Sequence, residues 1–268
     1  MFDREYLKKE MEKLDGLMKE RLDFYLIGGG SMSFQNLKDA TKDIDVVVRS
    51  EHDLKLLRDA LVRTGYSVPA VRGPYRQMQA SLIMENRDGF RWDIFVMVIC
   101  GGLRLSDAMI RRAVELFRFD RVSVHMISLE DIFIFKSVTS RERDREDMYQ
   151  LFLQGLDFTV IRDEIIWQNE LNRNAAWLAF FFNGVEEVVE RYSIVIPFYD
   201  EFHELAYNDM VSQMILDRLE KGNVDVEELV RELGVDDIEV HLDKLVDKKL
   251  IINNGDSIYS LNSDSLRL

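Results

Sequence analysis

The sequence has little cysteine and no long apolar run. Its one cysteine, Cys100, excludes an internal disulfide and a zinc site built from several cysteines. The longest strongly apolar runs, at 94–100 and 175–182, are far shorter than the roughly 18 residues that a membrane span needs. The N-terminus carries charge at once and lacks the apolar centre of a signal peptide. We therefore expect a cytoplasmic protein with no membrane association.

Positive charge is in deficit, because the formal net charge is -14. This balance disfavours broad affinity for nucleic acid, which depends on neutralising phosphates. The deficit is uneven: Arg63 to Arg121 holds ten arginines and no lysine, whereas His203 to Leu268 holds fifteen acidic and seven basic residues. The arginines of the middle segment suit an anionic substrate, since the guanidinium fork matches phosphate. The alternative is that they form salt bridges on the surface.

The hydrophobic pattern predicts an α+β fold, with a mixed sheet flanked by helices. We expect three parts: a catalytic domain at 1–153, a helical segment at 154–202 and a C-terminal module at 203–268. Strands are predicted at 24–27, 43–48, 76–84, 90–98 and 121–126. Helices are predicted at 2–22, 31–40, 53–64, 106–117 and 157–190, with one further helix that starts after Ser128 and another that ends at Gly155. Pro197 marks a connector at 194–198.

The C-terminal module has the outline of a winged helix-turn-helix. Its predicted elements are helices at 211–219, 226–233 and 236–248 and a hairpin of strands 250–252 and 257–261. The third helix would be the one to read DNA, yet it carries more acidic than basic side chains. We therefore expect a homodimer or protein-docking surface here, and DNA binding is disfavoured.

Three carboxylates are candidates for a metal site. Asp43 and Asp45 alternate with Ile44 and Val46 on a predicted strand, so they share one face about 6.6 Å apart. Asp93 lies on another apolar strand, where a charge is costly unless it is paired or binds a metal. Hard divalent cations prefer such oxygen ligands.

A glycine turn precedes these acids. Gly28, Gly29 and Gly30 allow the backbone to approach a ligand closely, and the helix predicted from Ser31 directs N–H groups towards phosphate. The Ser31 hydroxyl is a further potential donor. The pattern is neither a P-loop nor a dinucleotide-binding fingerprint. A plain strand-to-helix turn is the alternative interpretation of the glycines alone.

Taken together, the glycine turn, the Asp43-Ile44-Asp45-Val46 strand and Asp93 resemble the signature of the DNA polymerase beta-like nucleotidyltransferase superfamily over residues 24–97. The resemblance implies that Gly28, Gly29 and Ser31 hold a triphosphate. It also implies that Asp43, Asp45 and Asp93 hold Mg²⁺ (or Mn²⁺), with Asp93 near the acceptor. Metal clamping of an in-line displacement agrees with this division of roles.

The resemblance extends to about residue 153 through a lysine and a charged stretch. Lys136 in an apolar helix, followed by residues 143–147, is similar to motifs of the prokaryotic abortive-infection nucleotidyltransferases and related uncharacterised proteins. That similarity implies that Lys136 contacts nucleotide phosphates and that Arg143, Asp144 and Asp147 support the site. The alternative is a solvated helix in which Arg143 and Asp147 pair at i,i+4.

The sequence thus predicts a metal-dependent nucleotidyltransferase that moves a nucleoside monophosphate from an NTP to an acceptor hydroxyl and releases pyrophosphate. The sequence does not specify whether the acceptor is a protein, an RNA end or a small molecule. It lacks the pattern that marks tRNA-maturing relatives. The alternative is a non-catalytic, nucleotide-binding regulatory or antitoxin-like protein. Trp167 and Trp177 favour core or partner contacts over base stacking.

Overall fold

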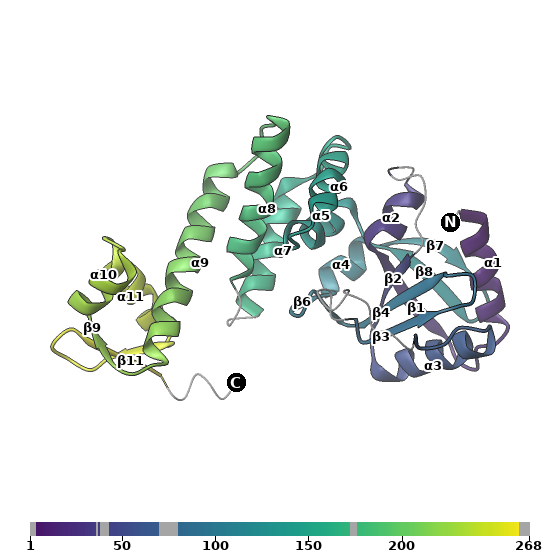
Figure 1. Cartoon of the computed structure of the whole chain (residues 1–268), viewed down its shortest axis with the longest axis horizontal. Coiled ribbons are helices and arrows are strands. Elements are labelled where there is room, and N and C mark those ends of the chain that lie inside the picture. Colours follow the sequence, from purple (N-terminus) through teal and green to yellow (C-terminus); the bar gives the residue numbers. More distant parts are fainter. Residues whose placement is uncertain (1–3, 36, 38–42, 70–79, 172–175, 263–268) are drawn as a thin grey trace.

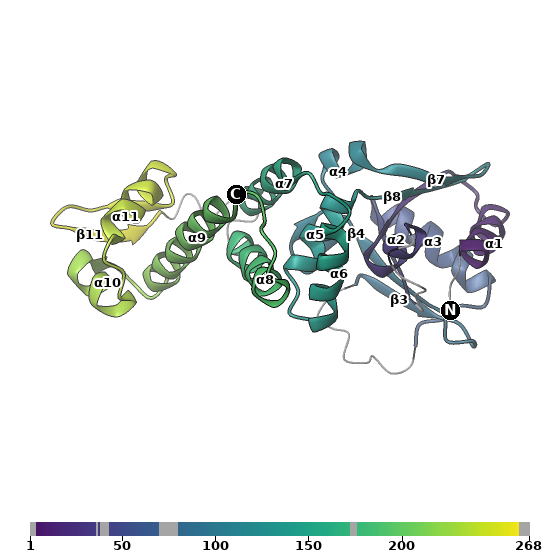
Figure 2. The same ribbon diagram turned by 90° about the horizontal axis from the view of Figure 1, so that it is seen from above.

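Three parts follow one another along the long axis of the molecule: a sheet with its covering helices, a helical layer and a small C-terminal module (Figures 1 and 2). The structure is a computed structural model that describes residues 4–35, 37, 43–69, 80–171 and 176–262. Within this part of the chain no helix combines the length and apolarity needed to cross a bilayer.

The central sheet is mixed, as predicted. Its strand order is β3-β4-β2-β1-β8-β7; the pairs β2–β4 and β1–β8 are parallel and the other neighbours are antiparallel. The strands are β1 (Leu22–Ile27), β2 (Asp43–Val48), β3 (Leu82–Glu85), β4 (Arg91–Val96), β7 (Val114–Arg118) and β8 (Val122–Met126), and a separate hairpin joins β5 (Val98–Ile99) to β6 (Leu103–Arg104).

The helices of the first two parts cover both faces of this sheet. They are α1 (Arg4–Asp15), α2 (Gly28–Phe34), α3 (Glu51–Arg63), α4 (Asp107–Arg112), α5 (Leu129–Ser137), α6 (Glu142–Phe152), α7 (Phe158–Leu171) and α8 (Trp177–Tyr192). Helices α1 and α3 pack on the face that carries Phe24, Ile44 and Trp92. The opposite face carries Val47 and Phe95, and α5 to α8 enclose it in a second core.

Two predicted elements differ from the structure. The helix expected at 106–117 is wrong beyond Arg112, because Ala113 turns to extended geometry and β7 then pairs with β8 at the sheet edge. The helix expected at 2–22 ends at Asp15, whose Oδ1 accepts the backbone N–H groups of Arg121 and Val122 at 2.7 and 2.9 Å. In both places tertiary pairing overrides the local helical pattern.

Other boundaries shift by smaller amounts. The strand expected at 90–98 breaks at Met97, which has a φ of 56°. The helix expected at 31–40 ends at Phe34, and residues 38–40 of that prediction lie outside the described residues. The predicted strand at 76–84 begins outside the described residues, and so do residues 172–175 of the helical segment expected at 157–190. Ser128 caps α5 as predicted, accepting the N–H of Asp131.

The helical segment and the sheet share one hydrophobic core. Side chains from β1, β2 and β4 belong to the same buried cluster as those of α5 to α8 and the start of α9 (Tyr199–Leu219). A boundary at residue 153 therefore does not separate two cores. The helical layer packs against the sheet face that carries the candidate site.

The C-terminal module has its own core. It contains the second half of α9, α10 (Val226–Leu233), α11 (Ile238–Asp247) and a small sheet of order β10-β11-β9. The strands are β9 (Val224–Asp225), β10 (Ile251–Asn253) and β11 (Ile258–Leu261). The expected helices and hairpin are present, β9 is an additional strand, and α9 runs continuously from one core into the other (Figure 1).

Candidate functional site

The three predicted acids lie on two neighbouring interior strands of the sheet, β2 and β4. Asp45 of β2 and Asp93 of β4 are register partners on adjacent parallel strands, so their Cα atoms are about 4.8 Å apart. Asp43 lies two residues before Asp45 on the same strand, opposite Arg91. All three acids share the sheet face that α5 and α6 cover. Two strands thus bring three carboxylates together.

The glycine turn lies directly against Asp45. Gly28 follows β1, has a φ of +62° and stands where an added Cβ would be 2.5 Å from the Asp45 Oδ2 atom. Only glycine meets both conditions, since other residues adopt this backbone conformation at a cost and their Cβ would displace the carboxylate. The turn and the acids therefore form one site.

The helix after this turn starts earlier than expected. It begins at Gly28 rather than at Ser31, Gly28 and Gly29 are partly exposed, and the first backbone N–H groups of α2 have no intrahelical acceptors. Ser31 is fully buried, and its Oγ has no hydrogen-bond partner among the described residues. In this conformation the Ser31 hydroxyl is not exposed at the surface of the turn.

Burial and neighbouring carboxylate charges raise the pKa values of Asp45 and Asp93. Burial, followed by the charges of Asp93 and Asp43, raises the pKa of Asp45 to about 7, although Lys136 and Arg141 act in the opposite direction. Burial also raises the pKa of Asp93, and its hydrogen bonds with Arg91 limit that rise. Such mutual repulsion is relieved by a cation, so the cluster is disposed to bind one.

Arg91 already supplies part of that positive charge. Its Nε and Nη2 donate to Oδ1 and Oδ2 of Asp93 at 2.5 and 2.8 Å, and the pair is largely shielded from solvent. Among the described residues, no three His, Cys, Asp or Glu side chains are grouped so that they could hold a metal ion. The donor chemistry of the three carboxylates fits Mg²⁺, and a cation bound there would share Asp93 with the guanidinium of Arg91.

Lys136 lies behind the acids in a buried ion-pair cluster. Its Nζ donates to Asp144 at 2.6 Å and lies 2.7 Å from Asp147, and all three side chains are nearly excluded from solvent. The ammonium is thus held by two carboxylates of α6 rather than turned towards an open surface. Its charge nevertheless acts on Asp45, which places the cluster next to the acids.

The structure separates Arg143 from this cluster. Arg143 is exposed, and Asp147 pairs with Lys136, so the i,i+4 pair between Arg143 and Asp147 is not what holds α6 in place. Asp144 instead accepts from Lys136, Thr139 and Arg141. The supporting role implied for Asp144 and Asp147 therefore has a physical basis in the placement of Lys136.

Sequence reasoning missed two arginines near the acids. Arg91 is bound to Asp93, and the charge of Arg141 lowers the pKa of Asp45. The i, i+2 spacing of Arg91 and Asp93 on one strand was an available signal, because it puts both side chains on the same face. Cys100 is also close, and burial raises the pKa of its thiol to about 12, so it stays protonated and unreactive.

Comparison with known proteins identifies a family for most of the chain. Residues 5–176 match the family described as "Nucleotidyltransferase of unknown function (DUF6036)". No curated protein matches the chain. The crystal structure of JHP933 from Helicobacter pylori aligns with 81% of this chain and 96% of its own at 12% identity, but the TM-score of 0.35 is too low to support any argument. Because the family match spans most of the chain and includes the acids, the glycine turn and the lysine cluster, this protein belongs to the DUF6036 nucleotidyltransferases.

Proposed function

We propose that the protein is a metal-dependent nucleotidyltransferase that transfers a nucleoside monophosphate from an NTP to an acceptor hydroxyl. The observation that carries the proposal is the convergence of Asp43, Asp45 and Asp93 beside Gly28, whose missing side chain leaves room for the Asp45 carboxylate. A protein that only binds nucleotides gains nothing by gathering three carboxylates near a phosphate. Membership of a nucleotidyltransferase family supports the same general role.

Each part of the site has a task in this proposal. Asp43, Asp45 and Asp93 would hold Mg²⁺ or Mn²⁺, which supplies charge stabilisation for the attacking and leaving oxygens. The backbone N–H groups of Gly28 and Gly29 bind the triphosphate. Lys136 contributes positive electrostatic potential at Asp45 and does not contact the phosphates directly.

The reaction itself is a displacement at the α-phosphorus. The acceptor oxygen forms a bond to that phosphorus while the bond to the bridging oxygen of pyrophosphate breaks. Asp93 takes the proton of the acceptor hydroxyl, for which its raised pKa is suited. Arg91 holds the carboxylate of Asp93 in orientation while this occurs.

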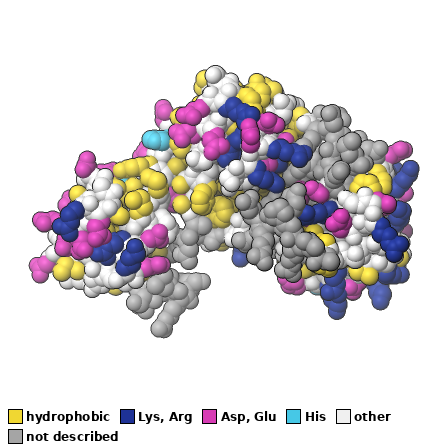
Figure 3. All heavy atoms as spheres, viewed as in Figure 1, with side chains coloured by type: hydrophobic (Ala, Val, Ile, Leu, Met, Phe, Trp, Pro, Cys, Tyr) yellow, Lys and Arg dark blue, Asp and Glu magenta, His cyan; other side chains and the backbone are white. Residues whose placement is uncertain are grey.

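The arrangement at Arg91 also favours a second candidate function. Because both oxygens of Asp93 are engaged by a guanidinium, the chain could serve as a nucleotide-binding regulator without turnover. In that case the C-terminal module, which we interpret as a winged helix, would supply the partner contacts. It exposes Val240, Ile252 and Ile258, and hydrophobic side chains also gather along the surface around α9 in Figure 3.

Turnover separates the two candidates. The purified protein is incubated with Mg²⁺ or Mn²⁺ and each α-labelled triphosphate, and labelled product and released pyrophosphate are measured. The enzyme proposal predicts both signals, and their loss in the Asp43→Asn/Asp45→Asn double variant. Asp59→Asn, which changes an exposed carboxylate of α3, is the matched control and keeps full activity. Equal signals from the double variant and the wild type would refute the proposal, whereas nucleotide-induced thermal protection without turnover would support the regulator.

A further inference from the structure

A cavity outside the candidate site lies beyond the C-terminal end of β4. It has a volume of about 630 Å³, lies between α4 and α7, and is bordered by Met97, the residue that follows β4. Met97 is four residues beyond Asp93, which is about 13 Å along an extended strand. None of the residues that line the cavity belongs to the candidate active site, so the two sites are distinct.

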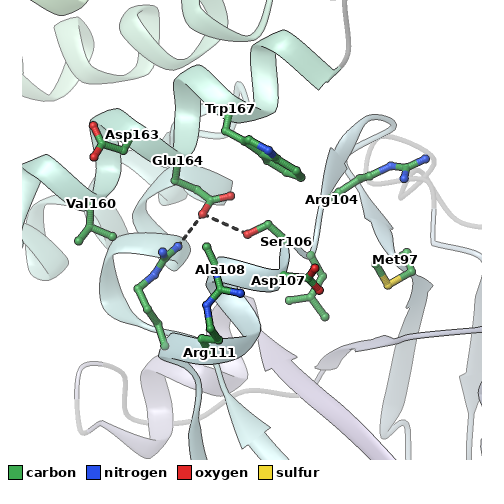
Figure 4. Close-up of a pocket in the computed structure, with 12 residues that line it drawn as sticks. Met97, Arg104, Ser106, Asp107, Ala108, Arg111, Val160, Asp163, Glu164 and Trp167 are labelled. Carbon is green, nitrogen blue, oxygen red and sulfur yellow. Dashed lines mark hydrogen bonds and ion pairs between the residues drawn. The ribbon is translucent and has the colours of Figure 1, made fainter. Parts of the chain in front are cut away.

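The wall formed by α7 is built from one helix face. Val160, Asp163, Glu164 and Trp167 follow the i, i+3, i+4, i+7 pattern, so these four lining residues lie along one side of α7. Figure 4 shows Trp167 directed into the space between the helices, above Ser106. An indole carried on a helix face is a rigid surface with few rotatable bonds.

Buried hydrogen bonds hold this wall in place. Glu164 accepts from the Ser106 hydroxyl at 3.1 Å and from Arg112 at 2.7 Å, and Gln168 donates to it at 3.0 Å. Gln168 also bonds the backbone N–H and carbonyl of Arg104, which ties the β5–β6 hairpin to α7. The cavity is therefore preformed and needs no large rearrangement to accept a ligand.

Other polar groups of the cavity have no protein partner. The side chains of Arg104, Arg111 and Asp107 are exposed and make no ion pair or hydrogen bond within the described residues, unlike Arg112 and Asp163, which are paired. Trp167 is 42% exposed, whereas Trp92 and Trp177 are 0% and 6% exposed. One indole, two guanidinium groups and one carboxylate are thus available to a ligand.

These groups match a planar base joined to a phosphate. Bases stack on indole rings, guanidinium groups bind phosphate through charge-assisted hydrogen bonds, and a carboxylate accepts hydrogen bonds from an exocyclic amine. The volume also falls in the range of small-molecule sites. We propose that this cavity binds a nucleoside monophosphate, with the base against Trp167 and the phosphate at Arg111, and with Arg104 at the rim.

Tryptophan emission tests the proposal directly, because Trp167 is the only tryptophan with a large exposed fraction. AMP is titrated into the full-length protein with EDTA, so that no metal-dependent binding at the acids contributes. We expect quenching in the wild type, in the Asp43→Asn/Asp45→Asn variant and in Trp177→Phe, and its loss in Trp167→Phe. Adenosine, which lacks the phosphate, should bind at least tenfold more weakly than AMP.

Calorimetric titration of AMP provides a readout that does not need the indole. Arg111→Ala should weaken binding at least tenfold, and Ala108→Leu should abolish it by filling the space between α4 and α7. Arg58→Ala, which removes an exposed arginine from α3, should bind AMP as the wild type does. Circular dichroism establishes that each variant is folded. An absence of AMP binding, or binding that persists unchanged in folded Ala108→Leu, would overturn the proposal and would leave the turnover experiment above unaffected.

Discussion

At the scale of single residues, Gly28 connects backbone geometry to the candidate chemistry. Its positive φ and its closeness to Asp45 are two independent reasons for the absence of a side chain. Gly30 lies in the same turn and helix, yet an added Cβ there would meet nothing within 4 Å, and its φ is not positive. The two glycines thus have different roles although the sequence presents them as equivalent.

We predict that Gly28→Ala abolishes metal-dependent turnover and that Gly30→Ala retains it. The first change adds roughly 1–2 kcal/mol of backbone strain and displaces the Asp45 carboxylate. The second gains helix propensity of up to about 1 kcal/mol. Parallel activity assays and thermal melts of both variants check this. Equal activity in the two variants would show that the contact between Gly28 and Asp45 has no part in the site.

The buried pair of Lys136 and Asp144 gives a pH-dependent prediction. Burial alone would raise the pKa of Asp144, but Lys136, Thr139 and Arg141 outweigh it, and the pKa lies below its ordinary value. A carboxyl with a lowered pKa in the folded state binds fewer protons there than in the unfolded chain. Its contribution to stability is therefore present above about pH 4 and disappears as the pH falls through the folded pKa.

Asp144→Asn should accordingly lower the free energy of unfolding by about 1–3 kcal/mol at pH 7. The difference from the wild type should shrink as the pH falls below about 4, because the unfolded chain is protonated first and native Asp144 only at its lowered pKa. Urea unfolding of both proteins at pH 7 and near pH 3 measures this, with Asp59→Asn as the exposed control. A difference that is independent of pH would contradict the charged character of the pair.

Residue types and spacings were enough to predict which acids share a face. The alternation of Asp43 and Asp45 predicted that these two acids share a face, and the register of β2 and β4 places Asp93 beside Asp45. That the three acids together hold a metal stays a prediction. The spacing did not predict which acidic side chains pair with the nearby lysine and arginine side chains. Lys136 is bound by two acids and Asp93 by Arg91, because such pairings depend on contacts between elements that a linear pattern does not contain.

At the scale of secondary-structure elements, the position of α5 depends on α8. Helix α5 is buried along most of its length, and its C-terminal turn carries Lys136. Gly184 of α8 faces that turn, and a Cβ at this position would be 2.2 Å from the backbone oxygen of Ser137. A small residue on α8 thus sets how closely the two helices approach and, through Ser137, where Lys136 stands.

We predict that Gly184→Ala destabilises the protein by about 1–3 kcal/mol, because the obstacle is backbone and does not rotate away. Glu190→Ala, an exposed change on the same helix, should alter stability by less than about 0.5 kcal/mol. Chemical unfolding of both variants provides the comparison. A Gly184→Ala protein as stable as the wild type would mean that α8 does not fix the position of α5.

The element that the sequence pattern predicted least well is β7. Residues 106–117 carry a helical pattern, but the segment after Ala113 forms an edge strand with β8. Hydrogen bonding to an existing strand edge compensates for a weak local preference, and that edge is formed by residues later in the chain. The strands β2 and β8, in contrast, were predicted almost to the residue, because turn signals and alternating or apolar runs bound them.

At the scale of the whole molecule, α9 links two hydrophobic cores. Phe202 and Ala206 belong to the core of the sheet and helical layer, whereas Val211, Ile215 and Leu219 belong to that of the C-terminal module. Because the two cores share a helix but few buried side chains, we expect the module to unfold as a separate unit.

Leu242→Ala tests this expectation. Leu242 is fully buried in the C-terminal core, so its truncation should destabilise the module by about 2–5 kcal/mol. Differential scanning calorimetry should show that one transition moves to lower temperature while the other keeps its midpoint, with the exposed change Val240→Ala moving neither. A single transition that shifts as a whole would show that the two cores unfold together.

The most direct test of the central claim is Mn²⁺ binding to the protein without nucleotide, followed by electron paramagnetic resonance of the free ion. If Asp43, Asp45 and Asp93 form one cation site beside the glycine turn, the wild type binds Mn²⁺, and Asp45→Asn, which keeps the size of the side chain, binds it at least tenfold more weakly. Asp59→Asn should bind as the wild type does. Undiminished Mn²⁺ binding by Asp45→Asn, or no binding by the wild type, would contradict the account.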